Sequence, residues 1–389
     1  MAGPEYDLVV LGGGIHGCGL AQAAAAAGYR VLLLEQTALA AGTSSRSSKL
    51  IHGGLRYLET GELRLVRESL AERRRLLRLA PGLVRLVDHH IPVYPETRRR
   101  PGRLWAGLAL YALAGGLHRD SLFSRLPRRD WGGLDGLRTR GLQQVFRYRD
   151  AQTDDAALTR AVARSAQALG ARILVPARFL EAQRQGDTWR VRFQAGFERR
   201  LVTARALVNA AGPWVGEILA RIPDAGRAIP FELVQGSHIL LDRPLHHGVY
   251  YVEAPDDGRA VFVMPWRGGG QTLVGTTETP YQGDPARVTP LPEELDYLQR
   301  TLAAYFPACR DLRPVASFAG LRVLPGGADT PFRRSRETRL LADCEGTLVS
   351  IYGGKLTVYR ATAARVLRRL RPVLPRRRAR ADTARLPLT

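Results

Sequence analysis

A glycine-rich turn near the N-terminus has the residue types and spacing needed to bind a cofactor through its phosphates. Gly12, Gly14 and Gly17 form a GxGxxG pattern that follows one short apolar run, and Glu35 ends the next apolar run. The glycines permit a tight turn, close approach of the backbone to a pyrophosphate and close packing of helix on strand, while the acid accepts hydrogen bonds from a ribose. The alternative is an ordinary tight turn between a strand and a helix. The pattern favours a dinucleotide-binding unit but does not distinguish NAD from FAD.

A second segment, residues 42–58, is rich in small hydroxyl residues and forms neither a good strand nor a good helix. Its hydroxyl and N–H groups could wrap phosphates and the edge of a flavin. The segment contains Lys49, one of only two lysines in the chain, and the other, Lys355, follows Gly353 and Gly354. Because an ammonium and a guanidinium are not interchangeable at a tight site, we take both lysines as candidate site residues.

The composition excludes several classes of protein. Among 389 residues, 45% are hydrophobic and 24% charged, as in soluble globular proteins. The formal net charge of +22 permits nucleic acid, a membrane surface or acidic ligands as partners. The arginines are dispersed and lack an aromatic stacking stripe, so we expect no nucleic acid. Three cysteines without a CxxC pair predict no disulfide and no metal site. No apolar run reaches the roughly 18 residues needed to span a bilayer, which predicts a cytoplasmic protein.

The elements that must position these motifs fall into two groups. Strands and helices alternate in the first group, with strands at 7–11, 31–34, 206–210 and 348–351 and helices at 20–27, 61–80, 155–170 and 357–370. Strands at 232–241, 250–253, 260–265 and 271–277 follow one another in the second group and predict an antiparallel sheet.

We therefore predict an α/β FAD-binding Rossmann-type domain with an interleaved α+β substrate domain built on an antiparallel sheet. The predicted boundaries assign 1–90, 150–228 and 312–372 to the FAD-binding domain, 91–149 and 229–311 to the substrate or cap domain, and 373–389 to a frayed basic tail.

The stretch 104–117 and the two histidine pairs each have a structural and a functional interpretation. The uncharged stretch 104–117 is bracketed by arginines, so it predicts either a helix lying in a membrane interface or a helix packed on the core. The pairs His89–His90 and His246–His247 lack a neighbouring carboxylate of the kind a metal site needs, and we expect all four in exposed loops.

Several motifs occur together and in one order between about residues 5 and 370. They are the N-terminal unit, 43–59, Asn209 to Val215 (NAAGPWV), Gln235 to Ile239 (QGSHI), Gly275-Thr276-Thr277, Gly320-Leu321-Arg322 and Gly353 to Thr357 (GGKLT). As a set they resemble the FAD-dependent glycerol-3-phosphate dehydrogenases of the D-amino-acid-oxidase-like flavoprotein group. Many members carry an extra C-terminal helical domain, which this chain is expected to lack.

The resemblance implies which residues hold FAD and which line the substrate pocket. The implied cofactor-binding residues are Gly12, Gly14, Gly17, Glu35, Thr43, Ser44, Ser45, Ser48, Lys49, Gly212, Gly320, Gly353, Gly354, Lys355, Leu356 and Thr357. The implied pocket residues are Arg56, Tyr57, His238, Arg322, Arg336 and Lys355. Arginine forks and a lysine suit a phosphate ester. His238 is the leading general base, His52 its rival, and Arg322 an electrostatic clamp.

The resemblance also implies an activity, oxidation of sn-glycerol 3-phosphate to dihydroxyacetone phosphate with hydride transfer to flavin N5. Electrons would pass to a quinone or another respiratory acceptor, with the protein at the inner face of the cell membrane. The first alternative is a flavin oxidase or dehydrogenase of an amino acid or a 2-hydroxy acid. The second is a basic RNA-associated or non-catalytic flavoprotein subunit.

Overall fold

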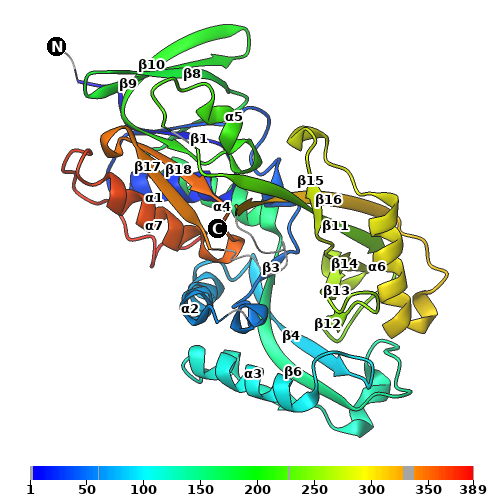
Figure 1. The fold of residues 1–389 in the computed structure, drawn as a ribbon. Helices are drawn as coiled ribbons and strands as arrows, with labels where there is room; N and C mark the ends of the chain where they lie inside the picture. The colour runs from blue at the N-terminus through cyan, green and yellow to red at the C-terminus, as the bar shows by residue number, and fades with distance from the viewer. Residues whose placement is uncertain (1–2, 60, 227, 327–336, 389) are drawn as a thin grey trace.

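A computed structural model describes residues 3–59, 61–226, 228–326 and 337–388. In Figure 1 these residues form two neighbouring sheets, one at the upper left and one at the right, with helices packed against both. From edge to edge, the first sheet runs β17 (Arg339–Asp343), β18 (Leu348–Tyr352), β10 (Glu198–Asn209), β1 (Tyr6–Leu11), β2 (Val31–Leu34) and β7 (Arg172–Leu174). Beyond this path, β9 (Thr188–Ala195) pairs with β10, and β8 (Arg178–Gln185) pairs with β9.

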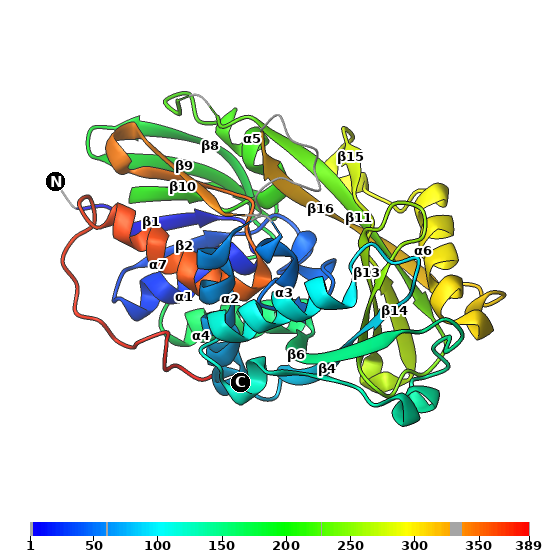
Figure 2. The ribbon, with the colours of Figure 1, turned by 60° about the horizontal axis from the view of Figure 1, so that its bottom comes forward.

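The central strands of the first sheet are parallel. β1 pairs in parallel with both β10 and β2, and β10 pairs in parallel with β18. All residues of β1 and β2 are buried, which explains their continuous apolar sequences. Helices α1 (Ile15–Ala26), α4 (Asp155–Ala168) and α7 (Tyr359–Leu370) pack together on one face of this sheet (Figure 2). The predicted β-α-β unit is therefore present.

The second sheet is antiparallel apart from the pair β4–β12. Its order is β15 (Thr279–Tyr281), β11 (Phe231–Leu241), β14 (Gln271–Gly275), β13 (Ala260–Trp266), β12 (Val249–Glu253), β4 (Val84–Val93), β6 (Gln144–Thr153) and β3 (Leu50–Ile51). β16 (Ala316–Pro325) pairs with β11, and β5 (Phe123–Arg125) pairs with β6.

Helices cover both faces of the second sheet. Tyr250 packs in a core cluster with α6 (Pro292–Tyr305), while its neighbour Tyr251 packs in a cluster with α3 (Pro101–Ala114) and α2 (Leu63–Leu79). Consecutive residues of a strand point to opposite faces, so α6 and α3 lie on opposite sides. The remaining α-helix, α5 (Val215–Leu219), packs beside the first sheet.

The predicted fold class is confirmed, since an α/β unit and a largely antiparallel sheet are both present and are built from interleaved parts of the chain. Each antiparallel strand expected between 232 and 277 is found within two residues of its predicted ends. The division into domains by residue number stays a prediction.

Helix α3 confirms core packing for residues 104–114, and the membrane-interface interpretation stays a prediction. Leu104, Leu108 and Tyr111 are buried against the second sheet, whereas Trp105 is 48% and Leu113 60% exposed. The helix therefore packs on the core and still presents an apolar surface.

The prediction of a frayed tail at 373–389 was wrong. Leu374 and Leu388 are buried in the core cluster of the first sheet. The Arg377 guanidinium lies 3.0 Å from the carboxylate of buried Asp7, and the Arg380 amide donates to the Ala26 carbonyl at 2.7 Å. Figure 2 shows this red segment running beside the helices of the first sheet. The many arginines of this segment suggested a solvated tail, but Leu374, Leu388 and the contact with Asp7 hold it in place.

Candidate active site

A cavity of about 650 Å³ is lined by chain segments that are far apart in the sequence. They include 11–16, 34–37, 41–44, 46–48, 210–214, 320–324 and 353–357. Both sheets contribute to its wall, because β1 and β2 end there and β11 and β16 pass along it.

The GxGxxG turn forms one end of the cavity. Gly12 has φ +108°, and a Cβ there would lie 2.7 Å from the Ala210 carbonyl oxygen. A Cβ on Gly17 would lie 1.9 Å from the Gly12 carbonyl oxygen, so Gly17 sits behind the turn and does not line the cavity. Gly14 caps α1 without a side-chain hydrogen bond, and the Ser44 hydroxyl accepts from the Ile15 amide at 2.9 Å. Hydroxyl and helix N-terminus together suit a pyrophosphate.

Glu35 stands where the motif predicts a ribose. Its Oε2 accepts from the Gly13 amide at 2.7 Å, and its Oε1 accepts from the Thr37 amide at 2.8 Å and the Thr37 hydroxyl at 3.1 Å. A carboxylate offers about four acceptor sites, so this one, on the cavity wall, can still accept from a ribose hydroxyl.

The hydroxyl-rich segment contributes only part of its residues to the cavity. Thr43, Ser44 and Ser48 line it, whereas Ser45 and Lys49 lie behind its wall. The Lys49 ammonium is buried, 2.7 Å from Asp155 Oδ1 and 2.5 Å from the Ser45 carbonyl oxygen. Lys49 therefore ties this segment to the first turn of α4 and does not reach into the cavity.

Four glycines on three other segments bring backbone close to the same cavity. A Cβ on Gly320 would lie 2.5 Å from the Arg46 carbonyl oxygen, and one on Gly354 would lie 2.0 Å from His16 Nε2. Gly353 and Gly354 have φ of +71° and +118°, and Gly212, with φ +56°, opens the 3₁₀ turn η5 (Gly212–Trp214). Leu356 and Thr357, in η10 (Leu356–Val358), line the cavity beside them. The absence of side chains at Gly320 and Gly354 therefore lets these segments pack closely together at the cavity wall.

His238, on β11, faces the cavity as a buried neutral imidazole. Its Nε2 lies 3.0 Å from the Ser48 hydroxyl, and its ring stacks on Phe318 at 4.8 Å between centroids. Burial, with the charges of Arg322 and Lys49, lowers the pKa of His238 to about 3. The ring is therefore a proton acceptor at neutral pH.

Cationic side chains gather at the same end. Arg322 donates from Nη1 to the Thr277 carbonyl at 3.2 Å and from Nη2 to the Thr276 hydroxyl at 3.0 Å. Arg56, in η2 (Leu55–Leu58), lies 3.6 Å from Glu278 Oε1. The Lys355 ammonium lies 3.4 Å from the centroid of the Tyr57 ring, and all of these residues except Thr277 line the cavity. The remaining predicted pocket residue, Arg336, lies outside the described residues.

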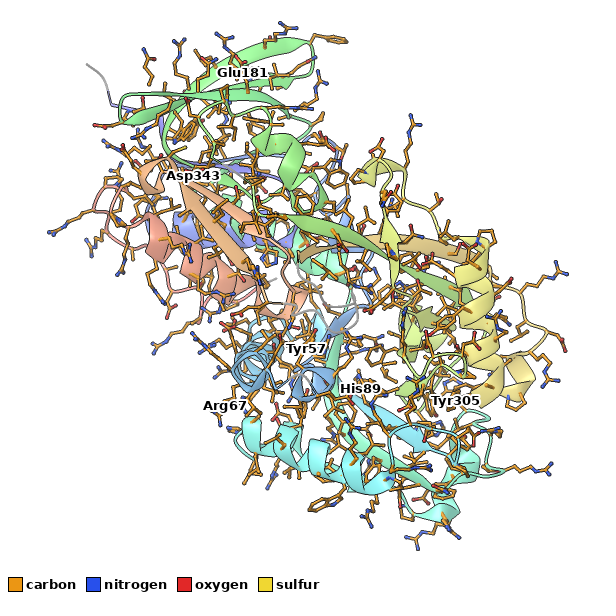
Figure 3. All side chains as sticks on the ribbon, in the orientation of Figure 1. Tyr57, Arg67, His89, Glu181, Tyr305 and Asp343 are labelled. Carbon is orange, nitrogen blue, oxygen red and sulfur yellow. The ribbon has the colours of Figure 1, made fainter. Side chains whose placement is uncertain are left out.

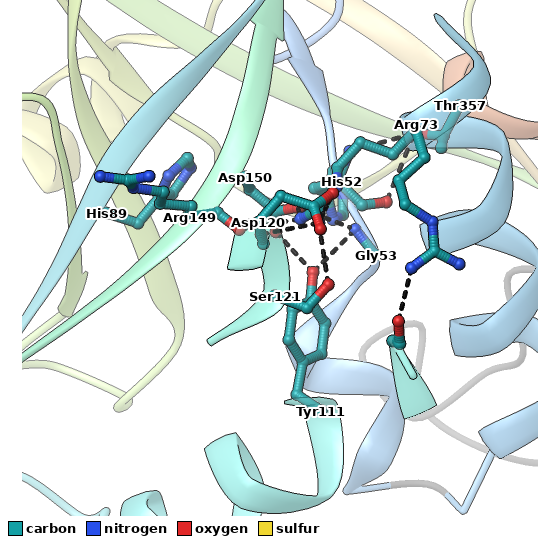
Figure 4. Close-up of polar contacts among 12 residues, drawn as sticks. His52, Gly53, Arg73, His89, Tyr111, Asp120, Ser121, Arg149, Asp150 and Thr357 are labelled. Carbon is teal, nitrogen blue, oxygen red and sulfur yellow. Dashed lines mark hydrogen bonds and ion pairs between the residues drawn. The ribbon is translucent and has the colours of Figure 1, made fainter. Parts of the chain in front are cut away.

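His52 also lines the cavity, and its backbone is held from two sides. Its amide donates to the Thr357 hydroxyl at 3.1 Å, and the next amide, Gly53, donates to the Tyr111 hydroxyl at 3.0 Å. Burial is the main cause that lowers the pKa of His52 to about 4. Figure 4 shows the buried polar network behind this turn, which includes Asp150.

The prediction that His89 and His90 occupy an exposed loop was wrong. Both are buried in β4, with His89 facing Tyr148 and His90 facing Tyr250. His89 lines the cavity, and Figure 3 shows it on β4 near the middle of the molecule. The apolar residues that follow the pair, Ile91 to Val93, were the signal for a strand. The second pair, His246 and His247, is exposed as predicted.

Comparison with known proteins identifies close matches over nearly the whole chain. A family model described as FAD dependent oxidoreductase matches residues 7–360. The chain is 40% identical over 378 residues to a glycerol-3-phosphate dehydrogenase of Pseudomonas aeruginosa, an alignment that covers 94% of the chain and 72% of that protein. It is 38% identical over 386 residues to D-erythritol 1-phosphate dehydrogenase of Brucella abortus, covering 96% and 76% respectively.

A solved structure gives the same result. The glycerol-3-phosphate dehydrogenase from Bacillus halodurans, complexed with FAD, superposes with a TM-score of 0.76 at 27% identity, covering 98% of the chain and 67% of that protein. The glycine-rich turn, the N-terminus of α1 and the acid that follows β2, all on the cavity wall, are features that bind such a cofactor.

Proposed function

The chain belongs to the family of FAD-dependent oxidoreductases, and on this basis we propose that it oxidises sn-glycerol 3-phosphate to dihydroxyacetone phosphate. The observation that carries the proposal is the grouping of Arg56, Arg322 and Lys355 with neutral His238 on one cavity, beside the cradle for FAD. When bound, FAD supplies the acceptor for the hydride that leaves C2. Relatives named for the oxidation of phosphorylated alcohols support this choice of substrate.

The cationic residues would bind and orient the substrate. A phosphate dianion needs guanidinium forks and a point-charge ammonium, which Arg56, Arg322 and Lys355 provide. With the phosphate held there, the C2 hydroxyl can approach the imidazole of His238, which takes its proton while Arg322 stabilises the negative charge developing on oxygen.

The pKa of His238 fits this role once the substrate is considered. Without substrate, the positive charge of Arg322 contributes to lowering the pKa. A bound phosphate brings negative charge next to the same guanidinium, which raises the pKa toward the working pH. Substrate binding therefore makes the imidazole a stronger base at the moment it is needed.

Anaerobic reduction of the bound flavin tests the proposal. We expect the FAD-loaded protein to be yellow and glycerol 3-phosphate to bleach it in the absence of oxygen. A panel of 2-hydroxy acids and amino acids should leave the colour unchanged. Bleaching by those carboxylates while phosphorylated alcohols fail would establish the first alternative. A protein that takes up FAD but is bleached by none of these compounds, and that binds RNA with a steep dependence on salt, would establish the second.

We further propose that electrons pass to a membrane quinone and that α3 docks the protein on the inner face of the cell membrane. Within the described residues, none of the helices combines the length and apolar character needed to cross a bilayer. Trp105, Leu113 and Leu117 form an exposed apolar surface on and just after α3, and Arg100 and Arg103 are exposed beside it. Aromatic and arginine side chains around an apolar face suit an interface that carries anionic lipid.

Flotation with vesicles containing anionic lipid measures this contact. Trp105→Glu combined with Leu113→Glu is expected to reduce the floating fraction about tenfold, because two apolar anchors are lost. The control is Phe197→Glu, a fully exposed aromatic in the turn between β9 and β10, which should float like the unchanged protein. Equal flotation of both variants would rule out α3 as the docking surface.

A further inference from the structure

The turn formed by His52, Gly53 and Gly54 lies at the cavity. A buried polar network, whose side chains do not line the cavity, holds this turn in place. Tyr111, on the buried face of α3, accepts from the Gly53 amide at 3.0 Å and donates to Asp150 Oδ2 at 2.7 Å. Asp150 Oδ1 lies 2.5 Å from Arg73 Nη1 and 3.3 Å from the Gly53 amide. Neither Tyr111, Asp150 nor Arg73 lines the cavity.

Arg73 connects this network to a second set of partners, Asp120 and Ser121. Arg73 is fully buried and donates from Nη2 to the Asp120 carboxylate at 3.0 Å and to the Ser121 hydroxyl at 3.1 Å. Figure 4 shows these contacts converging on Asp150 and Tyr111 from α2, α3 and β6. Burial, with the charge of Asp150, raises the pKa of Tyr111, so its hydroxyl remains protonated and can donate.

Packing leaves this turn little freedom to shift. A Cβ on Gly53 would lie 2.4 Å from the Tyr111 hydroxyl oxygen and 2.6 Å from Leu70 Cδ2. Gly54 follows with φ +80°, and a Cβ there would lie 2.0 Å from the Tyr57 ring. A change in the position of the Gly53 peptide is therefore transmitted directly to η2, which carries Arg56 and Tyr57.

A buried charged network of this kind is a poor way to obtain stability alone. Apolar side chains of the same volume usually stabilise a fold as well or better, because they avoid the cost of removing charges from water. The Tyr111 hydroxyl, the Asp150 carboxylate and both terminal nitrogens of Arg73 do have partners, and such hydrogen bonds fix one geometry more closely than apolar contacts do. Here the geometry that it fixes is that of the peptide joining His52 to Gly53, between the cavity-lining residues His52 and Gly54.

We propose that Tyr111 is a positioning residue for the reaction, which holds the His52–Gly53–Gly54 turn, and through it η2, at the flavin and the substrate. This inference rests on the proposed function and extends it to a residue on α3 whose own side chain touches neither ligand. Displacement of a reacting geometry by about 1 Å costs about 100-fold in rate, so loss of one pinning contact should be measurable.

The test compares two Tyr→Phe variants of the FAD-loaded protein. Tyr111→Phe keeps the ring and removes only the hydroxyl. Its matched control is Tyr305→Phe, another buried tyrosine, whose hydroxyl donates to the Glu253 carbonyl at 2.8 Å and which does not line the cavity. Tyr305, labelled in Figure 3, is the last residue of α6 and packs on the opposite face of the second sheet from α3.

We expect both variants to melt at lower temperatures, by similar amounts. Only Tyr111→Phe should lower kcat for glycerol 3-phosphate, about 10- to 100-fold, with a smaller change in KM and a shift in the visible absorption bands of the bound flavin. The inference is overturned if Tyr111→Phe matches Tyr305→Phe in kcat and in flavin spectrum. The spectrum requires no turnover, so it still decides the question if the unchanged protein fails to oxidise glycerol 3-phosphate, a failure that would count against the proposed function alone.

Discussion

Replacing His238 by alanine is expected to slow the reduction of bound FAD by glycerol 3-phosphate about 10²- to 10⁴-fold, the usual contribution of a general base. The imidazole of His238 is buried and neutral on the cavity wall, where its Nε2 lies 3.0 Å from the Ser48 hydroxyl. The charge of Arg322 contributes to lowering the pKa of His238. Alanine removes the acceptor and leaves the cationic residues that bind phosphate in place. Stopped-flow measurement of flavin bleaching without oxygen gives the rate directly.

The matched control is His246→Ala, because His246 is exposed and does not line the cavity. Its flavin should be reduced at the unchanged rate. His52→Ala provides the decisive comparison, since His52 is a second neutral imidazole on the same wall. A large loss in His52→Ala with normal reduction in His238→Ala would transfer the role of base to His52.

The second large effect concerns stability. Asp150→Ala is expected to lower the free energy of unfolding by about 3–5 kcal/mol, the usual result of removing one partner from a buried ion pair. Asp150 and Arg73 are both buried, and the substitution leaves the guanidinium without its closest counter-charge and the Tyr111 hydroxyl without its acceptor. Urea unfolding of the FAD-loaded protein, with the slope checked for constancy, measures the difference.

An exposed ion pair supplies the contrast. Asp256 lies 2.8 Å from Arg300, with side chains 46% and 59% exposed, so Asp256→Ala should change the free energy of unfolding by less than about 1 kcal/mol. If Asp150→Ala proved as mild as this control, the Arg73–Asp150 pair would not be a major support of the fold.

Local patterns predicted much of the framework. β2 was expected at 31–34 and is found at Val31–Leu34, because a strand buried on both faces needs a continuous apolar run. Tyr359–Leu370 forms the helix expected over 357–370, preceded by a 3₁₀ turn at Leu356–Val358. In each case, neighbouring residues along the chain carry the information.

Burial of individual polar residues was not predictable in this way. The residues after His89 and His90 indicate a strand, but the two imidazoles are buried against Tyr148 and Tyr250, which only folding places beside β4. Lys49 was correctly marked as unusual, but its partner Asp155 lies 106 positions away, so the sequence could not show that its ammonium faces away from the cavity.

The sequence by itself determined the cofactor-binding unit, because GxGxxG, Glu35 and the later glycine motifs act through backbone geometry that is local to each motif. It also determined the set of cationic and imidazole side chains available for chemistry. Only the tertiary structure decided which of these side chains share a cavity, and it added Tyr111, Asp150 and Arg73 behind the His52–Gly53 turn. The physical reason is that hydrogen bonds and ion pairs act over a few ångströms, whereas the residues that form them here come from α2, α3 and β6, which only folding brings together.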